Sequence, residues 1–288
     1  MPVGALVALL ALAPPAQPAR QPAPLEERRL TVGGVERRYL VQRAAGAPAP
    51  LVIVFHGAGG SAAQIARAHG WRALAARERA TVVFPDGVGR RWGDGWALRE
   101  RPGVDDFAYV RAVLADVARA APVDARRTFA VGHSNGAFFA QALACRLPGA
   151  FAAIGTVAGQ LAEGAVAACR STPPVSAVAV HGTADPLVPY AGGAFGLGAP
   201  LLPVVASAAW RAGRAGCAPT PRRTAVNASV RRLVWTGCDA GRGAELWTVV
   251  GGTHAWPGSP TRRSRAAADA ALDATAVIWD FFRTHPAR

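Results

Sequence analysis

The stretch RRTFAVGHSNGAFFAQALAC, residues 126–145, joins two apolar patterns through a serine that lies between two glycines. Phe129 to Val131 form a short unbroken apolar run, which is typical of a strand buried on both faces. After Gly136 the apolar residues recur at helical spacing. Glycines on both sides of Ser134, where a strand turns into a helix, indicate a crowded junction in which the serine takes a strained conformation. An ordinary tight turn is the alternative interpretation.

The rest of the chain repeats this alternation of strand and helix signals. Strands that alternate with helices of about 10–20 residues favour an α/β fold, with a mostly parallel central sheet and helices on both faces. A Gly-Gly turn within residues 30–42 predicts a hairpin or bent strand, and residues 231–238 and 245–250 predict a late antiparallel or edge pair. Further strands are predicted at 51–55, 81–85, 128–131, 151–157 and 175–180, and helices at 61–79, about 104–120, after Ser134, and 266–283.

Length and composition favour a single folded domain. The 288 residues, 51% of them hydrophobic, suffice for one large core, and no repeat or linker divides the middle of the chain. An apolar run from Val3 to Ala13, followed by small residues and prolines, has the length of a signal-peptide core, although its start lacks the usual positive charge. We interpret residues 1–24 as a signal peptide and Pro/Ala-rich spacer, and residues 25–288 as one α/β domain. No later apolar segment is long enough to cross a bilayer.

The net charge of +14 raises the question of a nucleic-acid partner. The basic residues are all arginine, and they occur in scattered pairs such as Arg28-Arg29 and Arg222-Arg223 rather than along one helix. Aromatic stacking motifs are absent, so we expect no nucleic-acid partner. A basic surface still favours anionic substrates or cell-wall polymers.

The four cysteines fit an oxidising compartment, which predicts a secreted or periplasmic protein. Four cysteines allow three pairings. We favour the two local bridges Cys145–Cys169 and Cys217–Cys238, because each pair brackets one segment, with buried free thiols as the alternative. No CxxC spacing supports a metal site, and we expect no metal.

Ser134 is a candidate nucleophile, because its Oγ would project at the first turn of a helix, where free backbone N–H groups can stabilise an oxyanion. A serine needs a base and an acid, and after a G-x-S-x-G elbow these follow in the order acid, then histidine. His254 lies in a Gly-rich loop directly after an apolar strand and is the candidate base. Asp185 comes just past a buried strand and is the candidate acid, in preference to Asp239 beside Cys238.

The segment HGAGG, residues 56–60, follows the predicted strand 51–55. Glycines there let backbone N–H groups approach a substrate carbonyl. We predict an oxyanion hole formed by the amide of Ala58, with Gly57 close behind, and the amide of Asn135. A plain turn at the end of a strand is the alternative.

Aromatic side chains near these motifs are candidates for substrate binding, because their rings offer large apolar faces. Core packing is nearly as good an explanation for the tryptophans. Two acidic residues, Asp105 and Asp106, are instead predicted to cap a helix and complement its dipole. The candidate substrate-binding residues are Trp92, Trp96, Trp256 and Tyr190.

Taken in order, six motifs of the chain resemble the poly(3-hydroxybutyrate) depolymerase and feruloyl esterase family of secreted α/β-hydrolases. The similarity runs from about Leu30 to Phe282. It implies an α/β-hydrolase fold and a catalytic domain with esterase activity, in which Ser134, Asp185 and His254 act without a metal or an organic cofactor. The motifs are HGAGG, the FPDG turn followed by W-x-D-G-W, GVDDFAYV, GHSNG, HGTADPLVPY and GGTHAWPG.

Two departures from the family pattern affect this expectation. Many relatives carry a further glycine after the elbow, where this chain has Ala137. Extracellular polymer depolymerases usually append a linker and a substrate-binding domain, whereas this sequence ends soon after its last predicted helix, so binding to solid polymer is not expected.

The predicted function is therefore a serine esterase that hydrolyses carboxylic esters through a Ser-His-Asp triad and an acyl-enzyme. Hydroxybutyrate oligomers, feruloyl or acetyl esters and short-chain esters are the substrate classes, and the pattern does not separate them. Two other functions stay open: an acyltransferase or peptidase on the same scaffold, and a secreted binding protein with an inactive cleft.

Overall fold

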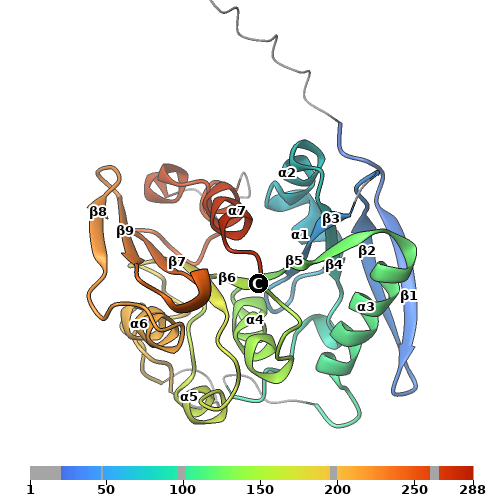
Figure 1. The fold of residues 1–288 in the computed structure, drawn as a ribbon, viewed down its shortest axis with the longest axis horizontal. Coiled ribbons are helices and arrows are strands. Elements are labelled where there is room, and N and C mark those ends of the chain that lie inside the picture. Colours follow the sequence, from blue (N-terminus) through green and yellow to red (C-terminus); the bar gives the residue numbers. More distant parts are fainter. Residues whose placement is uncertain (1–20, 47, 97–100, 195–199, 260–265, 288) are drawn as a thin grey trace, which may run out of the picture.

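A computed structural model of the protein describes residues 21–46, 48–96, 101–194, 200–259 and 266–287, and most of the predicted signal peptide lies outside them. The described residues form a ten-stranded sheet with helices on both faces (Figure 1). In spatial order the strands are β1 (Glu26–Val32), β2 (Val35–Gln42), β4 (Thr81–Pro85), β3 (Ala49–Phe55), β5 (Val123–His133), β6 (Ala153–Val157), β7 (Ser176–Gly182), β10 (Ala244–Val249), β9 (Val230–Trp235) and β8 (Arg222–Ala225).

The middle of the sheet, from β4 to β10, is parallel, and an antiparallel hairpin or strand pair completes each side. This arrangement confirms the predicted α/β fold with a mostly parallel sheet. Phe55 lies opposite Gly132, and His133 lies opposite Val157, so the carboxyl ends of β3, β5 and β6 are aligned. Loops that follow these ends therefore meet at one edge of the sheet, where parallel sheets collect their functional residues.

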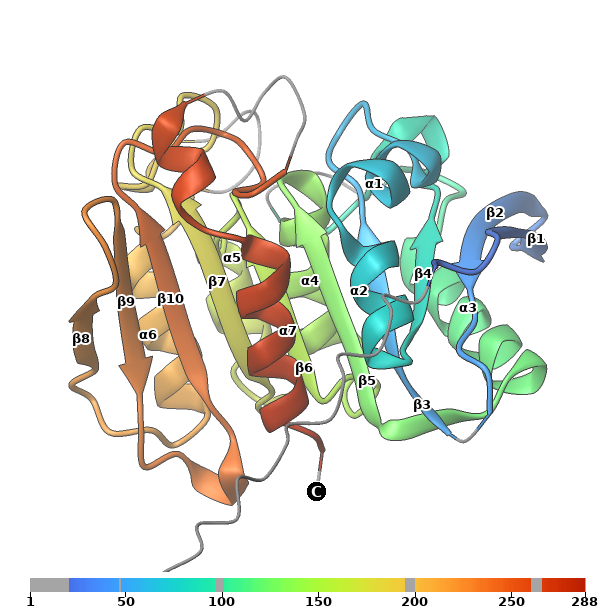
Figure 2. The ribbon, with the colours of Figure 1, turned by 90° about the horizontal axis from the view of Figure 1, so that it is seen from above.

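Helices α1, α2 and α7 cover one face of the sheet, and α3, α4, α5 and α6 cover the other, as two perpendicular views show (Figures 1 and 2). Both faces of the central strands are thus buried, which explains their unbroken apolar sequences. The helices are α1 (Ala62–Ala68), α2 (Trp71–Glu78), α3 (Asp106–Ala120), α4 (Asn135–Arg146), α5 (Glu163–Ala168), α6 (Val204–Arg214) and α7 (Ala274–Thr284).

Two predicted helices have different bounds in the structure. The helical pattern at 61–79 is divided into α1 and α2, because Gly70 adopts φ +73° and interrupts the helix. The closing helix begins at Ala274 rather than near 266, since the carboxylate of Asp273 caps it by accepting from the Ala276 N–H at 3.0 Å. A short 3₁₀ turn, Ala267–Ala271, precedes that cap.

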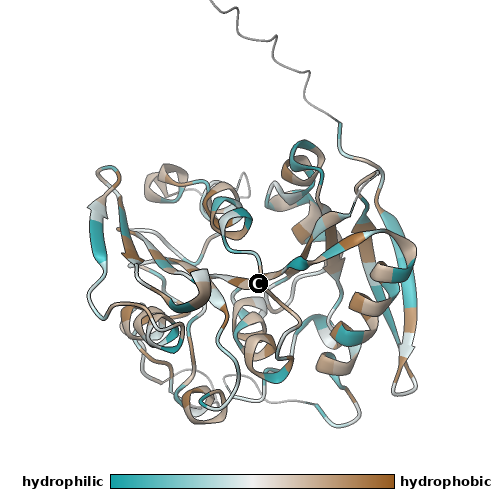
Figure 3. Ribbon diagram, in the orientation of Figure 1, coloured by the Kyte–Doolittle hydropathy of each residue, from teal (hydrophilic) through white to brown (hydrophobic). Residues whose placement is uncertain are grey.

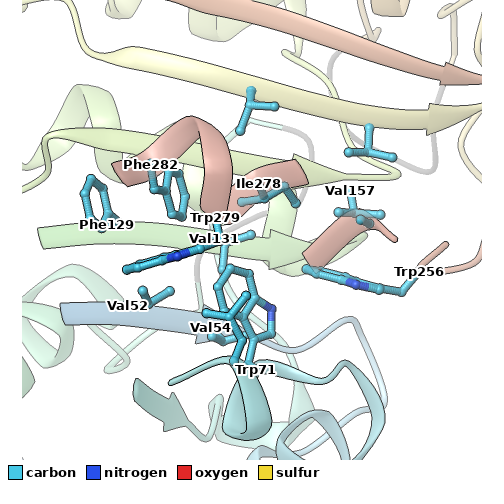
Figure 4. Packing of buried hydrophobic residues seen from close by; sticks show 14 of the residues in the cluster. Val52, Val54, Trp71, Phe129, Val131, Val157, Trp256, Ile278, Trp279 and Phe282 are labelled. Carbon is cyan, nitrogen blue, oxygen red and sulfur yellow. The ribbon is translucent and has the colours of Figure 1, made fainter. Parts of the chain in front are cut away.

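The core lies on both sides of the sheet. On the α7 side, Val52, Val54, Val131 and Val157 project from neighbouring strands toward Ile278, Trp279 and Phe282 of the helix (Figure 4). Phe129 stacks on Phe282 with ring centroids 4.6 Å apart. The ribbon coloured by hydropathy shows apolar central strands and more polar outer strands (Figure 3). Buried side chains of this kind contribute about 1.5–3 kcal/mol each, so the sheet is rigidly supported beneath its functional edge.

Both favoured disulfides are present. Cys145 in α4 is bonded to Cys169, the residue after α5, and Cys217 is bonded to Cys238. No free cysteine occurs among the described residues, so the free-thiol alternative is wrong. Each bridge closes a short loop, with sequence separations of 24 and 21 residues.

The two predicted helix-capping carboxylates have different roles. Asp105 is the N-cap of α3 and accepts from the Ala108 N–H at 2.7 Å, as predicted. Asp106 instead forms a buried ion pair with Arg37, with Nη2 2.7 Å from Oδ1 and side-chain exposures of 2% and 3%. Its other oxygen accepts from the Gly93 N–H at 3.0 Å, so Asp106 ties Gly93 to the first turn of α3.

The last strand of the sheet, β8, consists of Arg222, Arg223, Thr224 and Ala225, and all four residues are exposed. It pairs with β9 on one side only and forms an open edge of the sheet. The helices within the described ranges are all too short or too polar to cross a bilayer.

Candidate active site

The serine elbow lies exactly where the sequence pattern changes. Ser134 separates β5, which ends at His133, from α4, which begins at Asn135, and it adopts φ 54° and ψ −119°. A non-glycine residue with positive φ is strained, at a cost of about 1–3 kcal/mol. Surrounding hydrogen bonds hold it there: the Ser134 N–H donates to the Val157 carbonyl at 2.9 Å, and the Ser134 carbonyl accepts from two amides of α4.

The glycines on either side of Ser134 are required by the backbone that crosses them. A β-carbon at Gly132 would lie 2.0 Å from the carbonyl oxygen of Gly136, and one at Gly136 would lie 2.3 Å from the carbonyl oxygen of Phe55. Real β-carbons do not approach backbone oxygens that closely. The crowded, strained junction expected from the sequence is therefore confirmed, and an ordinary tight turn does not describe it.

Asp185 and His254 are in direct contact. Nδ1 of His254 lies 2.7 Å from Oδ2 of Asp185, and Oδ1 accepts from the N–H groups of Leu187 and Val188, each at 2.9 Å. Because a carboxylate can only accept, Nδ1 of His254 carries the proton of this bond. Nε2 of the neutral ring is then free to accept a proton from another group.

The environment of Asp185 keeps its carboxyl group ionised. Burial acts to raise the pKa, but hydrogen bonds from His181, from His254 and from the Val188 amide outweigh it and hold the pKa of Asp185 well below its ordinary value. His181 contributes through Nε2, which lies 3.4 Å from Oδ2 of Asp185 and 3.0 Å from the Val188 carbonyl. The carboxylate is therefore anchored by two amides of its own loop, by His181 at the end of β7 and by His254.

The imidazole of His254 lies beside the elbow. Its ring centroid is 5.1 Å from that of His133, the residue directly before Ser134. The loop that carries it is fixed by Asp269, a fully buried carboxylate that accepts from the N–H of Thr253 at 3.0 Å and from its hydroxyl at 2.8 Å. The structure thus brings the candidate nucleophile, acid and base to the same edge of the sheet.

The HGAGG segment forms a turn against the elbow. A β-carbon at Gly57 would lie 3.3 Å from Cβ of Ser134, so this turn and the serine are in contact. The Gly60 N–H donates to the Gly57 carbonyl at 2.9 Å, and Gly59 has φ +73°. Hydrogen bonds between the described residues use the amides of Gly59 and Gly60 but not those of Ala58 or Asn135, the two predicted oxyanion donors.

Two of the predicted substrate-binding tryptophans are wrong. Trp92 is fully buried, with its ring stacked on Phe139 at 5.1 Å and edge-on to Phe55 at 5.3 Å. Trp256 is 2% exposed, stacks on His69 at 4.3 Å and donates its indole N–H to Thr275. Neither ring is exposed enough to contact a substrate, because both side chains are buried in the core.

The other two predicted substrate-binding residues are only partly buried. Trp96 packs beside Phe138 in the first turn of α4 and beside Val188 in the loop that follows Asp185. Tyr190 donates to or accepts from the Thr248 hydroxyl at 2.8 Å, and its ring lies edge-on to His181 at 5.8 Å. Substrate contact by Trp96 and Tyr190 stays a prediction.

Three residues that support the site were missed from the sequence. His181 precedes the acid in the chain, so the order of a Ser-acid-His triad does not point to it, yet it contacts Asp185. Asp269 gave no signal, since it lies 16 residues beyond the Thr253 that it binds. His56 stands at the head of the HGAGG motif, and that position was the signal that went unused; its ring bonds to backbone groups on both sides of the turn.

Known esterases resemble this chain in sequence and in fold. Residues 36–169, which include the HGAGG turn and the elbow, match the family model described as Esterase PHB depolymerase. The protein named "Putative esterase NocK" from Nocardia uniformis subsp. tsuyamanensis is 33% identical over 85% of this chain and 81% of its own length. Feruloyl esterase B of Piromyces equi is 28% identical over 72% of this chain but only 40% of its own length.

A solved structure shows the same fold with little sequence similarity. The acetyl xylan esterase from Aspergillus awamori aligns over 90% of this chain and 99% of its own, with a TM-score of 0.62 and 13% identity. That likeness establishes the α/β-hydrolase fold, and the sequence relatives establish the kind of bond that is cleaved. The chain belongs to the Esterase PHB depolymerase family and is a serine hydrolase that acts on carboxylic ester bonds.

Proposed function

We propose that the protein hydrolyses carboxylic esters by two-step acyl transfer, with Ser134 as nucleophile, His254 as base and Asp185 as acid. The observation that supports this most directly is the Asp185–His254 hydrogen bond of 2.7 Å beside a serine held at φ 54°. The strained elbow exposes Oγ at the start of α4, and the histidine presents its free nitrogen at the same edge of the sheet.

In the first step His254 takes the proton of Ser134 as Oγ attacks the ester carbonyl carbon. The tetrahedral intermediate collapses as the C–O bond to the alcohol breaks, and His254 returns the proton to the departing alcohol. In the second step water attacks the acyl-enzyme with the same base, which releases the acid and restores Ser134. Asp185 fixes the tautomer of His254 throughout and stabilises the imidazolium that forms.

The negative charge that develops on the carbonyl oxygen is held by the amides of Ala58 and Asn135. Both amides are free of other hydrogen bonds between described residues, and Asn135 is the first residue of α4. An N–H at a helix start adds the favourable end of the helix dipole to the hydrogen bond. Each such donor is worth about 10²–10³ in kcat in serine hydrolases.

We propose hydroxybutyrate oligomers, feruloyl or acetyl esters and short-chain esters as the substrate classes, in a secreted or periplasmic enzyme. The family match supports hydroxybutyrate esters, and the feruloyl esterase relatives support feruloyl esters. The two disulfides support an oxidising compartment. A panel of methyl ferulate, hydroxybutyrate oligomers and acetylated xylan ranks them by kcat/KM. Peptide substrates and competing alcohol acceptors in the same panel separate a peptidase or acyltransferase from a hydrolase.

The decisive test is Ser134→Ala, assayed with p-nitrophenyl acetate and butyrate and with a fluorophosphonate probe. We expect hydrolysis to fall by several orders of magnitude and labelling to disappear, because the attacking hydroxyl is lost. Ser171→Ala is the matched control, since Ser171 is exposed after α5. Normal turnover by Ser134→Ala would refute the proposed function, and so would an unlabelled wild-type protein.

A further inference from the structure

We propose that His56 is a positioning residue for the oxyanion hole: its imidazole holds the Gly57 carbonyl so that the Ala58 N–H points at the substrate oxyanion. This inference rests on the proposed function, because the Ala58 N–H has an oxyanion to bind only if an ester is attacked at Ser134.

The two ring nitrogens of His56 have fixed and different partners. Nδ1 lies 2.8 Å from the Gly57 carbonyl oxygen, which can only accept, so Nδ1 carries the proton. Nε2 lies 3.0 Å from the backbone N of Gly87, which can only donate, so Nε2 is unprotonated. The side chain is 1% exposed, and burial lowers its pKa, which favours this neutral form. His56 is therefore a neutral donor to the turn.

The hydrogen bond from His56 to the Gly57 carbonyl also fixes the orientation of the Ala58 N–H, because both groups belong to the same planar peptide. The Gly57 carbonyl accepts from both His56 Nδ1 and the Gly60 N–H, at 2.8 and 2.9 Å, so its orientation is fixed twice. In a planar trans peptide the next N–H points away from the carbonyl. The Ala58 N–H thus points away from the imidazole. It belongs to the residue after Gly57, on which a β-carbon would lie 3.3 Å from Cβ of Ser134.

Trp92 connects this arrangement to the second oxyanion donor. Its indole N–H donates to the His56 carbonyl at 3.0 Å, and its backbone N–H and carbonyl bond to the side chain of Asn135 at 2.7 and 2.9 Å. All three residues are at most 1% exposed. The backbone segments that carry both oxyanion amides are consequently tied to Trp92, through its indole N–H on the His56 side and through its backbone on the Asn135 side.

Burial alone does not explain the contacts of His56. The Nδ1 atom of His69 is also buried, yet it has no hydrogen-bond partner among the described residues. Both nitrogens of His56 are used, and both bond to backbone groups of loops at the edge of the sheet that carries Ser134. This difference favours a positioning role over simple core packing.

Replacing His56 by asparagine or by glutamine tests its two hydrogen bonds one at a time. In His56→Asn the side-chain amide replaces Nδ1 and can still donate to the Gly57 carbonyl, whereas in His56→Gln it reaches the place of Nε2 and serves only Gly87. Each variant loses one buried hydrogen bond, so both should lower the melting temperature by similar amounts. We expect kcat of His56→Gln to fall about tenfold to hundredfold, with KM changed less than about threefold. His56→Asn should stay within about threefold of wild-type kcat.

A transition-state analogue provides a second readout. The affinity for a trifluoromethyl ketone, whose adduct carries an oxyanion, should weaken in His56→Gln in parallel with kcat. Equal kcat in the two variants, or a loss confined to KM, would overturn the positioning role. If His56→Gln does not fold, Trp92→Phe decides, since it removes the indole N–H from the His56 carbonyl: a lower kcat at constant KM supports the role, and an unchanged kcat overturns it.

Ser134→Ala measured alongside distinguishes the two proposals. If Ser134→Ala is inactive and the two His56 variants have equal kcat, only the positioning role is overturned. An active Ser134→Ala would overturn both.

Discussion

Nδ1 of His254 and Oδ2 of Asp185 lie 2.7 Å apart, although 69 residues of sequence separate them. They meet because β7 and β10 are adjacent and parallel in the sheet, with Gly182 opposite Val249 at their carboxyl ends. A β-carbon at Gly182 would lie 2.3 Å from the backbone of Gly252, so the two following loops are in contact from their first residues. The contact between Asp185 and His254 is therefore a consequence of strand order.

Asp185→Asn should lower kcat about 10⁴-fold while leaving the fold intact, because an amide at this position favours the wrong tautomer of His254. Initial rates with p-nitrophenyl butyrate across pH 6–9 measure the loss. Asp239→Asn, at the acid set aside by its place beside Cys238, is the control and should retain normal activity. A variant Asp185→Asn with more than about a tenth of wild-type kcat would contradict the assigned role.

Acid should destabilise the wild-type protein more than Asp185→Asn. The folded-state pKa of Asp185 is depressed below the unfolded value of about 3.9, so its contribution to stability is present above that pH and is lost as pH falls through the folded pKa. Urea midpoints measured between pH 6 and pH 3 should therefore converge for the two proteins at low pH. Parallel curves over this range would show that the carboxylate adds no pH-dependent stability.

Gly136→Ala should prevent folding or destabilise the protein severely, because its β-carbon would lie 2.3 Å from the Phe55 carbonyl oxygen, which belongs to a buried central strand. Gly213→Ala is the matched control: it lies within α6, and a β-carbon there meets nothing within 4 Å. We expect that control to be neutral or to gain up to about 1 kcal/mol. Soluble yield and thermal melting distinguish the two variants, and equal behaviour would contradict the crowding at the elbow.

Replacing both Cys145 and Cys169 by serine should reduce the free energy of unfolding by about 3 kcal/mol, as expected for a bridge with a sequence separation of 24 residues. The bridge ties α4, which begins next to Ser134, to the end of α5. Activity at 25 °C should persist, since Ser134, Asp185 and His254 are held by hydrogen bonds and strand ends other than this bridge. Chemical denaturation with and without reductant checks the value, because reductant should bring the wild type toward the variant.

Asp269→Ala should lower both stability and kcat. It leaves the N–H and hydroxyl of Thr253 without their buried acceptor and loosens the loop that carries His254, at a cost of about 1–3 kcal/mol. Thr253→Val removes only the hydroxyl contact and should lose less of both. Melting temperature and kcat measured on the same samples test the order of the three proteins, and a normal kcat in Asp269→Ala would contradict the effect on the loop.

Much of the site could be predicted because its signals are local. An apolar run followed by glycine marks the end of a buried strand, and the ends of β5, β7 and β10 carry Ser134, Asp185 and His254 within a few residues. Parallel strands bring such ends to one edge, so the pattern alone favours their meeting. The two disulfides follow from the same locality.

The failures all concern packing. A tryptophan near a motif can face a pocket or the core, and only the positions of Phe55 and Phe139 decide that Trp92 is buried. Strand β8 contains no large apolar residue and exists because it pairs with β9. The short helix α5 and the amphipathic helix α6 likewise depend on partners distant in sequence, as do the contacts of Asp269 with Thr253.

The arginines of β8 oppose the pairing of this edge strand with the same strand of another molecule. An uncovered outer strand offers unpaired N–H and C=O groups to any extended segment that approaches, which is how sheets extend into fibres. Arg222 and Arg223 stand on this strand and are exposed, and the ribbon coloured by hydropathy shows the strand as hydrophilic (Figure 3). Two such strands that approached each other would bring four guanidinium groups together, so mutual repulsion protects the sheet from growing by self-addition, whatever the enzyme hydrolyses.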